Sequence, residues 1–239
     1  MKNALVTGGS GAIGAAICRR LAADGCHVYI HAHRGLQAAQ TLADAIRAGG
    51  GSAQVLAFDV TDRAAVADAL TPLVENQPIQ ILVNNAGIHD DVVFPGMRAE
   101  QWHRVIDVSV NGFFNVTQPL MMPMIRSRWG RIINVSSIAA LTGNRGQVNY
   151  SAAKGALNSA TKSLAQEIAS RGITVNAVAP GIIDTPMSKS AFDAQAIARM
   201  VPMKRAGTPE EVADLIGFLA SAQAAYITGQ IISINGGII

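Results

Sequence analysis

The stretch Thr7-Gly8-Gly9-Ser10-Gly11-Ala12-Ile13-Gly14 decides the fold, because it joins an apolar run that ends at residue 7 to an amphipathic pattern at 13–24. Three of its glycines have the spacing G-x-G-x-x-G. Glycines allow a tight turn and a close approach of the backbone to a pyrophosphate, whose charge suits the N-terminus of the following helix. The spacing alone is a weak signal. Its position between a strand and a helix favours a dinucleotide site over a structural turn.

The rest of the chain alternates short β-rich runs with helical patterns. Amphipathic helices begin with 13–24 and 37–48, and no Pro/Ser-rich linker divides the chain. This alternation is typical of a parallel sheet built from right-handed crossovers. We therefore expect one α/β domain over 1–239, a Rossmann-type doubly wound parallel sheet of about seven strands with helices on both faces. The expected strands are 3–7, 27–31, 54–58, 80–84, 131–136, 174–178 and 230–234.

Composition narrows the class of protein. The chain has 239 residues, of which 49% are hydrophobic and 15% charged, and this excludes a disordered chain. Its mean hydropathy of +0.26 fits a sheet covered on both faces, or extra burial in an oligomer. The formal charge is 19 − 16 = +3, without a Lys/Arg cluster. This pattern does not favour a nucleic-acid groove, but it suits an anionic cofactor or an acidic partner.

Cysteines and apolar stretches bear on compartment. Cys18 and Cys26 are not spaced like a metal site or a redox pair, so we expect core packing and no metal. Such sparing use of cysteine is typical of a reducing compartment and predicts a cytoplasmic protein. The uncharged stretches 108–125 and 215–239 contain Asn, Gln, Thr or Pro and lack the sustained apolarity of a membrane span.

The end of the second predicted strand bears on cofactor type. An NAD site usually has an acidic residue about 20 residues after the glycines, which binds the ribose 2′-hydroxyl. Here the sequence is His31-Ala32-His33-Arg34, without a carboxylate. Arg34 and the two histidines could meet a 2′-phosphate, which favours NADP. The alternative is an exposed turn with an incidental Arg.

A candidate catalytic pair follows from helical spacing. Tyr150 and Lys154 are four residues apart at the start of a helical pattern, so they share one face. A nearby ammonium stabilises a phenolate, so we expect the pKa of Tyr150 to be lowered toward acid/base work. The alternative is a packed Tyr beside a snorkelling Lys. Ser137 lies at the end of a predicted strand, where ligands of open α/β sheets bind. Asn111 falls inside a helical stretch, which either a function or a helix irregularity would explain.

The segment 184–207 has weak periodicity and contains Met187, Met200 and Met203. We interpret it as a mobile substrate lid over a pocket, because Met gives adaptable apolar contacts. The alternative is a solvated loop with one ordinary helix. A helix is predicted to begin at Thr208-Pro209-Glu210-Glu211, which has the residues of a capping box.

The chain resembles the short-chain dehydrogenase/reductase family over essentially its whole length. The resemblance rests on the glycine loop, Asp59-Val60, Asn84-Asn85-Ala86-Gly87, Asn111, Ser137, Tyr150-x-x-x-Lys154 and Pro180-Gly181. Within the family, the sequence is most similar to the 3-oxoacyl-[acyl-carrier-protein] reductases. That similarity is carried by 143–154, 170–176 and Asn235-Gly236-Gly237.

The resemblance implies catalytic roles. Tyr150 would protonate the forming alkoxide, and Lys154 would hold the nicotinamide ribose and depress the Tyr pKa. Ser137 would hydrogen-bond the substrate carbonyl, with Gln147 also at the substrate. Asn111 would keep a water that relays protons. The chemistry would be hydride transfer from a reduced nicotinamide to a ketone carbon.

The resemblance also implies a set of cofactor-binding residues. Two departures from the family pattern matter. Ala12 stands where the family usually has Gly, and Gly11 stands where NADP-dependent members often have Arg or Lys. The preference for NADP over NAD is thus left to His33 and Arg34. The expected set is Gly8, Ser10, Gly11, Ile13, Gly14, His33, Arg34, Asp59, Val60, Asn85, Ala86, Gly87, Tyr150, Lys154, Pro180, Gly181, Ile183 and Thr185.

The function implied is NADPH-dependent reduction of a 3-oxoacyl thioester on acyl carrier protein. The family resemblance implies a homotetramer, with carrier docking by Arg128 and Arg171 near the pocket mouth. The segment 87–91 and Phe113-Phe114 also resemble reductases of polyene-type pathways, beside housekeeping fatty-acid synthesis. Two other functions stay open, because a fold hosts many functions. They are an NAD(P)-dependent dehydrogenase of a small alcohol or ketone, and a non-catalytic NADP-sensing protein.

Overall fold

The structure is a computed structural model that describes residues 1–76, 78–186, 188 and 193–239. Its centre is a seven-stranded parallel sheet in the order β3-β2-β1-β4-β5-β6-β7. Each strand lies within two residues of its predicted bounds, so the predicted fold class is confirmed. The strands are β1 (Asn3–Val6), β2 (His27–Ala32), β3 (Ser52–Ala57), β4 (Ile81–Asn84), β5 (Gly130–Val135), β6 (Ile173–Pro180) and β7 (Ile231–Ile234).

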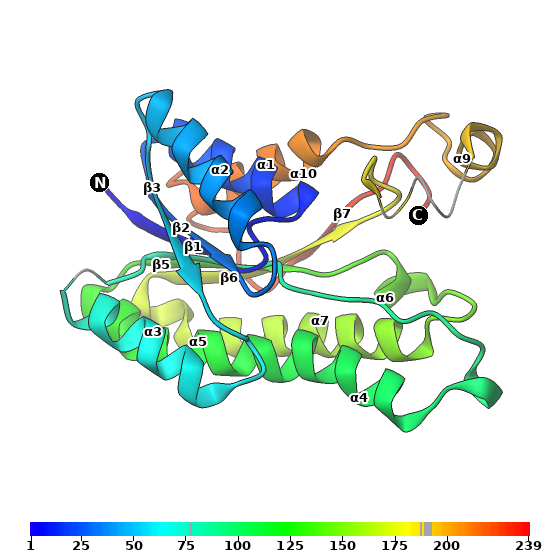
Figure 1. Cartoon of the computed structure of the whole chain (residues 1–239), viewed down its shortest axis with the longest axis horizontal. Coiled ribbons are helices and arrows are strands. Elements are labelled where there is room, and N and C mark those ends of the chain that lie inside the picture. Colours follow the sequence, from blue (N-terminus) through cyan, green and yellow to red (C-terminus); the bar gives the residue numbers. More distant parts are fainter. Residues whose placement is uncertain (77, 187, 189–192) are drawn as a thin grey trace.

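Helices cover both faces of the sheet (Figure 1). One face is packed by α1 (Ala12–Ala23), α2 (Leu36–Ala48) and α10 (Pro209–Ala220). The other is packed by α3 (Arg63–Asn76), α5 (Gly112–Ser127) and α7 (Val148–Ile168). The two layers bury separate apolar clusters. Every residue of β1, β4, β5 and β6 is buried, and this explains the apolar strands and the high mean hydropathy.

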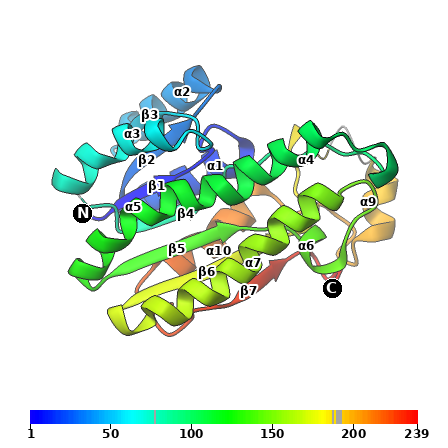
Figure 2. The same cartoon turned by 90° about the horizontal axis from the view of Figure 1, so that it is seen from below.

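The remaining helical elements are shorter than the helices of these two layers. They are η1 (Phe94–Gly96), α4 (Ala99–Ile106), the π-helix η2 (Asp107–Asn111), α6 (Ala139–Thr142), η3 (Ala169–Arg171) and α9 (Ala194–Met200). Figure 2 shows α4, α6 and α9 near the same end of the molecule, to which the carboxyl ends of the strands point. This end therefore carries the loops that build a site.

Two local predictions are confirmed. Cys18 and Cys26 are free, buried side chains of the core. Helix α10 begins with the predicted capping box: Thr208 Oγ1 accepts from the Glu211 N–H at 3.2 Å, and the Glu211 carboxylate accepts from the Thr208 N–H at 2.8 Å. Within the described residues, no helix is long and apolar enough to cross a membrane.

The order of the strands reverses between β1 and β4, because β1 leads toward β2 and β3 whereas β4 leads toward β5. Open α/β sheets bind ligands at this switch point, outside the carboxyl ends of the strands. The loops that leave β1 and β4 are joined there. The Thr7 hydroxyl accepts hydrogen bonds from the N–H groups of Asn85 and Ala86, both at 2.9 Å.

The segment 184–207 is described at both ends. A parallel bridge pairs Ile183 with Gly207 at its stem. The Asp184 N–H donates to the Gly207 carbonyl at 2.7 Å, and the Gly207 N–H donates to Ile182 at 2.9 Å. Met187 lies outside the described residues, as do 189–192. The role of the segment as a substrate lid stays a prediction.

Candidate active site

Three predicted catalytic residues come together where β5 ends beside the start of α7. Tyr150 and Lys154 lie one turn apart on α7, and the Ser137 hydroxyl interacts with the phenol of Tyr150 and lowers its pKa. Lys154 is only 3% exposed, and its Nζ donates to the Val135 carbonyl at 2.8 Å. Nζ lies 5.7 Å from the centre of the Tyr150 ring. A hydroxyl, a phenol and an ammonium thus converge at the sheet edge.

Burial raises the pKa of Tyr150 above its ordinary value near 10; the Ser137 contact opposes this shift, and the charge of Asp91 adds to it. The expected lowering by Lys154 is therefore wrong for this structure. The physical reason is that the Lys154 ammonium donates to Val135, and its own burial lowers its pKa to about 8. Tyr150 therefore keeps its proton at neutral pH, which is the state that a proton donor needs.

The structure does not join Asn111 to this group. It ends the π-helix η2, is exposed, and donates through Nδ2 to Asp107 Oδ1 at 2.7 Å. Among the described residues, no hydrogen bond links it to Tyr150 or Lys154. A helix irregularity is thus present at this Asn, and the water-holding role stays a prediction. On the same element, Ser109 is buried, and its hydroxyl has no hydrogen-bond partner in the part of the chain that the structure describes.

The glycine loop is held in one conformation by close packing. Gly8 has φ +62°, a left-handed value that favours glycine. A Cβ on Gly14 would lie 2.2 Å from the Gly8 carbonyl oxygen, so only glycine fits there. At Gly11, a Cβ would meet only that same oxygen, at 3.5 Å. Ser10 and Ile13 are half-buried beside these glycines.

His31 supports this loop from below. It is 2% exposed, and its Nδ1 accepts from the Gly8 N–H at 3.0 Å. Its Nε2 must then carry the proton, which it donates to the Phe58 carbonyl at 2.9 Å. The expectation that His31 faces a 2′-phosphate is therefore wrong, because the imidazole points into the protein. The sequence offered one sign of this inward direction. His31 lies within the second strand, whereas His33 follows the end of that strand.

A second anchor reaches the loop from β4. Asn85 donates through Nδ2 to the carbonyls of Thr7, at 2.9 Å, and of Gly8, at 3.1 Å. Ala86 follows it, and a Cβ on Gly87 would lie 3.1 Å from the Lys154 Nζ. These predicted cofactor residues therefore connect the glycine loop to the catalytic lysine.

The turn after β2 exposes His33 and Arg34, as a 2′-phosphate site requires. His33 Nδ1 lies 3.5 Å from Asp59 Oδ2, on the neighbouring turn after β3. Partial burial raises the pKa of Asp59, but hydrogen bonds from Thr61 and the charges of His33 and Arg34 outweigh it. The pKa of Asp59 therefore lies below its ordinary value. A carboxylate thus stands beside the two basic side chains.

The remaining predicted cofactor residues line the same edge. Val60 is buried, and its carbonyl accepts from Asn115 Nδ2 at 2.9 Å. Pro180 ends β6, and a Cβ on Gly181 would lie 2.7 Å from the Asn235 Cβ. Ile183 is buried. Thr185 donates its N–H to Ser188 Oγ at 3.0 Å.

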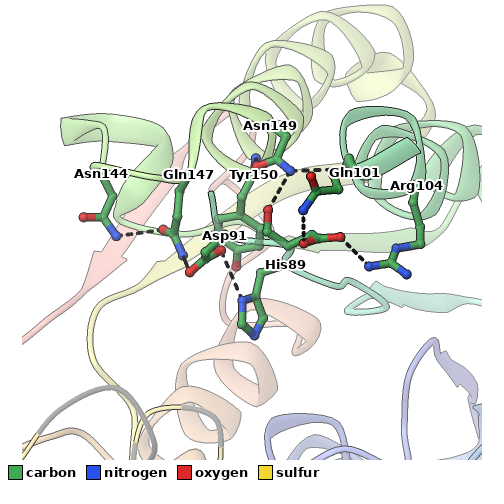
Figure 3. A network of polar contacts seen from close by, with 9 residues as sticks. His89, Asp91, Gln101, Arg104, Asn144, Gln147, Asn149 and Tyr150 are labelled. Atoms are coloured by element: carbon green, nitrogen blue, oxygen red, sulfur yellow. Dashed lines mark hydrogen bonds and ion pairs between the residues drawn. The ribbon is translucent and has the colours of Figure 1, made fainter. Parts of the chain in front are cut away.

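A polar network surrounds the start of α7 (Figure 3). Gln147, the residue before the first turn of α7, donates through Nε2 to Asp91 Oδ2 at 2.8 Å. Its Oε1 accepts from Asn144 Nδ2 at 2.8 Å, so the amide is held at both ends. Asn149 Oδ1 accepts from the Tyr150 N–H at 2.8 Å. Figure 3 shows Gln147 beside the Tyr150 side chain, so its role as a substrate contact stays a prediction.

Comparisons with known proteins agree with this geometry. A family profile described as "short chain dehydrogenase" matches residues 2–196. The 3-oxoacyl-[acyl-carrier-protein] reductase FabG of Aggregatibacter actinomycetemcomitans is 46% identical over 98% of both chains. Nodulation protein G of Azospirillum brasilense is 44% identical over 99% of this chain and 98% of its own. The acetoacetyl-CoA reductase of Allochromatium vinosum is 42% identical over 98% of this chain and 97% of its own.

The chain belongs to the short-chain dehydrogenase family. This short-chain dehydrogenase is an oxidoreductase with a site for a nicotinamide cofactor. The glycine loop fits a pyrophosphate, because its tight turn opens the N-terminus of α1 toward the switch point. The cluster of Tyr150, Ser137 and Lys154 stands at the same edge of the sheet.

The predicted docking arginines of this short-chain dehydrogenase lie elsewhere. Arg128 ends α5, and its Nη2 donates to the Ser170 carbonyl at 3.2 Å, next to Arg171. Both arginines are exposed and stand close together, as carrier docking requires. They precede β5 and β6, however, and so mark the amino ends of the strands. The prediction that they lie near the pocket mouth is therefore wrong, because within this chain they lie at the opposite edge of the sheet.

Proposed function

We propose that this short-chain dehydrogenase reduces a 3-oxoacyl thioester, carried on acyl carrier protein, to the 3-hydroxyacyl form with NADPH. The observation that carries the proposal is the convergence of Ser137, Tyr150 and the buried Lys154 at the switch point of the sheet. Several relatives are named as 3-oxoacyl-[acyl-carrier-protein] reductases, and this supports the substrate class. Fatty-acid synthesis or a polyene-type pathway would use this reaction.

The residues present fit NADP. Gly14 has no room for a Cβ, so the loop backbone stays close-packed where a pyrophosphate would lie. Arg34 and His33 are exposed beyond β2, where a 2′-phosphate would receive charge-assisted hydrogen bonds. Asp59 partly offsets this positive charge, since it stands 3.5 Å from His33. We infer that Arg34 contributes most of the preference for NADPH.

The protein's own groups supply the acid chemistry. Ser137 donates to the ketone oxygen and orients it, while Tyr150 transfers its phenolic proton to that oxygen. Lys154 would hold the nicotinamide ribose, and the Ser137 contact, which lowers the pKa of Tyr150, stabilises the phenolate that remains. The reduced nicotinamide, when bound, supplies the hydride that the ketone carbon receives. Carbon and oxygen each gain one hydrogen, so the product is the secondary alcohol.

A second candidate is reduction of a thioester on coenzyme A or of a small free ketone. The relative from Allochromatium vinosum named acetoacetyl-CoA reductase favours this reading. The test is NADPH oxidation with acetoacetyl carrier protein, acetoacetyl-CoA and simple ketones at matched concentrations. The proposal expects the highest kcat/KM for the carrier-bound substrate. Activity restricted to free ketones would overturn it, and a lack of turnover with tight NADPH binding would favour a sensor.

Assembly as a homotetramer is part of the proposal. Helix α5 exposes Phe114 and Met122, at 48% and 57%, and the C-terminal Ile239 is 57% exposed. Large apolar side chains at these levels are typical of faces that a second copy covers. Light scattering at micromolar concentration checks this, and a stable monomer would contradict it.

Carrier docking through Arg128 and Arg171 depends on that assembly. Because both precede the strands, a carrier bound there would serve the site of another copy. Replacing both with Glu should raise KM for the carrier-bound substrate, with a steep dependence on salt. KM for a short soluble thioester should change little. Equal losses on both substrates would contradict docking at this pair.

A further inference from the structure

The loop between β4 and α4 is fastened to the start of α7 by three hydrogen bonds. The Val92 N–H donates to the Gly146 carbonyl at 2.8 Å. Asn149, fully buried, donates to the Asp90 carbonyl at 3.0 Å. Gln147 Nε2 donates to Asp91 Oδ2 at 2.8 Å. The position of Asp91 is therefore set by the same helix that carries the catalytic phenol.

Adjacent acidic residues on this loop have opposite surroundings (Figure 3). The Asp90 carboxylate accepts from Gln101 Nε2 at 2.8 Å and pairs with Arg104 on α4. The Asp91 carboxylate instead lies beside Tyr150 in Figure 3, held by the hydrogen bond from Gln147 at the start of α7. Its charge adds to the rise in the pKa of that phenol. The Asp91 side chain is 43% exposed, so it is accessible from solvent. The Asp90 carboxylate therefore binds side chains of α4, whereas the charge of Asp91 lies at the active site.

Among the described residues, no Lys or Arg forms an ion pair with Asp91. His89 Nδ1 lies 3.1 Å from Asp91 Oδ1, and a neutral imidazole can donate there without removing the negative charge. Gln147 is neutral. The ammonium of Lys154, on the same helix as Tyr150, donates a hydrogen bond to the Val135 carbonyl. In the part of the chain that the structure describes, the charged or titratable groups placed near the phenol are Asp91, with its partner His89, and Lys154.

The negative charge of Asp91 should affect the binding of a substrate according to the charge of that substrate. The acid group of a 3-oxo compound is separated from the ketone carbon by a single carbon, so a ketone held at Tyr150 brings that group close to Asp91. A free 3-oxo acid carries a carboxylate there, and two like charges repel strongly in a partly desolvated site. An ester or thioester of the same acid is neutral. It meets no such repulsion.

We propose that Asp91 is a specificity-determining residue that excludes anionic 3-oxo acids and restricts the site to neutral acyl derivatives. The inference rests on the proposed function, in that the ketone is reduced at Tyr150. It assigns to the loop after β4 the selection of substrate charge. Gln147 would hold the Asp91 carboxylate in place for this purpose.

The experiment compares acetoacetate with its neutral ethyl ester, because the two differ mainly in the charge of the acid group. The wild-type protein should strongly prefer the ester. Asp91→Asn removes the charge but keeps an oxygen that can accept from Gln147. It should raise kcat/KM for acetoacetate relative to the ester by about tenfold or more. Asp91→Ser is a second neutral variant, for the case that the amide disturbs the loop.

Matched variants separate charge from structure. Asp90→Asn removes an equal charge from the neighbouring residue, and His89→Gln leaves the Asp91 charge in place. Both should keep the wild-type ratio of the two substrates. The basic limb of the pH profile for ester reduction gives a further readout. It should move to lower pH in Asp91→Asn, because the pKa of Tyr150 falls when the negative charge leaves.

Two failures can be told apart. An unchanged ratio in both Asp91 variants would overturn the specificity role, while reduction of the ester by the wild type would leave the proposed function standing. A ratio that shifts equally in Asp90→Asn would also overturn it, because the effect would then be general to the loop. Lack of wild-type activity on the ester and on acetoacetyl thioesters would instead overturn the proposed function.

Discussion

The glycine loop and the rim at the start of α7 are built in different ways. The glycine loop is held by the buried His31 imidazole and the half-buried Asn85 amide, which bind its backbone. The rim is held by side chains such as Gln147 and Asp91, which solvent can reach. A loop fixed through its backbone tolerates few changes, whereas an exposed side-chain network can change its chemistry residue by residue. We infer that cofactor geometry is invariant here and that substrate choice is adjustable.

The largest difference between the two regions is expected when the proposed acid, Tyr150, is replaced. Tyr150→Phe keeps the ring on α7 but removes the donor, so kcat should fall by about 10²–10⁴-fold. Cofactor affinity should change little, because the glycine loop is untouched. Steady-state kinetics and a fluorescence titration with NADPH check both statements. Near-normal turnover would show that Tyr150 is not the acid.

A methyl group should be enough to disturb the glycine loop. Gly14→Ala places a Cβ 2.2 Å from the Gly8 carbonyl oxygen, so the loop must move. We expect cofactor Kd to rise by roughly tenfold or more, since the helix N-terminus loses its alignment. The matched control is Gly11→Ala, whose Cβ meets that oxygen at 3.5 Å. Equal affinities in the two variants would contradict close packing as the cause.

The preference for NADPH over NADH tests the exposed residues of the cofactor site. Arg34→Ala should weaken NADPH binding by about tenfold, the typical value of a charge-assisted hydrogen bond. NADH binding should be nearly unchanged, because NADH has no 2′-phosphate. Competition titrations with both cofactors measure the difference. The same loss for both would show that Arg34 does not contact that phosphate.

Support of the loop by His31 should appear as a modest change in stability. His31→Ala leaves the Gly8 N–H without its partner and should lower the free energy of unfolding by about 1–3 kcal/mol. Burial lowers the pKa of His31, so the unfolded chain binds the proton more tightly than the folded one. The stabilisation is complete above the ordinary pKa near 6.5 and is lost as pH falls below it.

Urea unfolding at several pH values measures this dependence. The stability of the wild type should fall more steeply on acidification than that of His31→Phe, which has no titratable group there. Parallel curves for the two proteins would exclude a contribution from His31. Asp59 and His33 lie near this imidazole and remain in both proteins, so their contribution cancels in the comparison.

The fold was predictable because burial dictates it. Strands covered on both faces must be apolar throughout, and such runs separated by amphipathic helices are visible without coordinates. Tyr150, Lys154 and Ser137 were found for a related reason: helical spacing and strand ends place them at one edge. Side-chain direction was not predictable in the same way. His31 points inward and Asn111 outward, although each lies in a segment predicted with the correct type.

Two further errors have an electrostatic and a topological cause. The pKa of Tyr150 depends on how deeply the ring is buried and on which acceptor the Lys154 ammonium chooses, and spacing reports neither. Arg128 and Arg171 were placed near the pocket by resemblance, yet a residue that precedes a parallel strand stands at the edge opposite the site. Asp91 was visible as a charged residue after β4, but its link to Gln147 required the fold.

The bridge between Ile183 and Gly207 closes the chain on itself before α10 begins. A flexible insertion between these fixed ends adds an entropic cost that grows only with the logarithm of its length. Doubling that length costs about 0.6 kcal/mol. A short flexible insertion at the exposed Lys204 should therefore leave the melting temperature of the sheet within a few degrees of the wild-type value. Members of the family can therefore differ in the segment between Ile183 and Gly207 while they keep the same core.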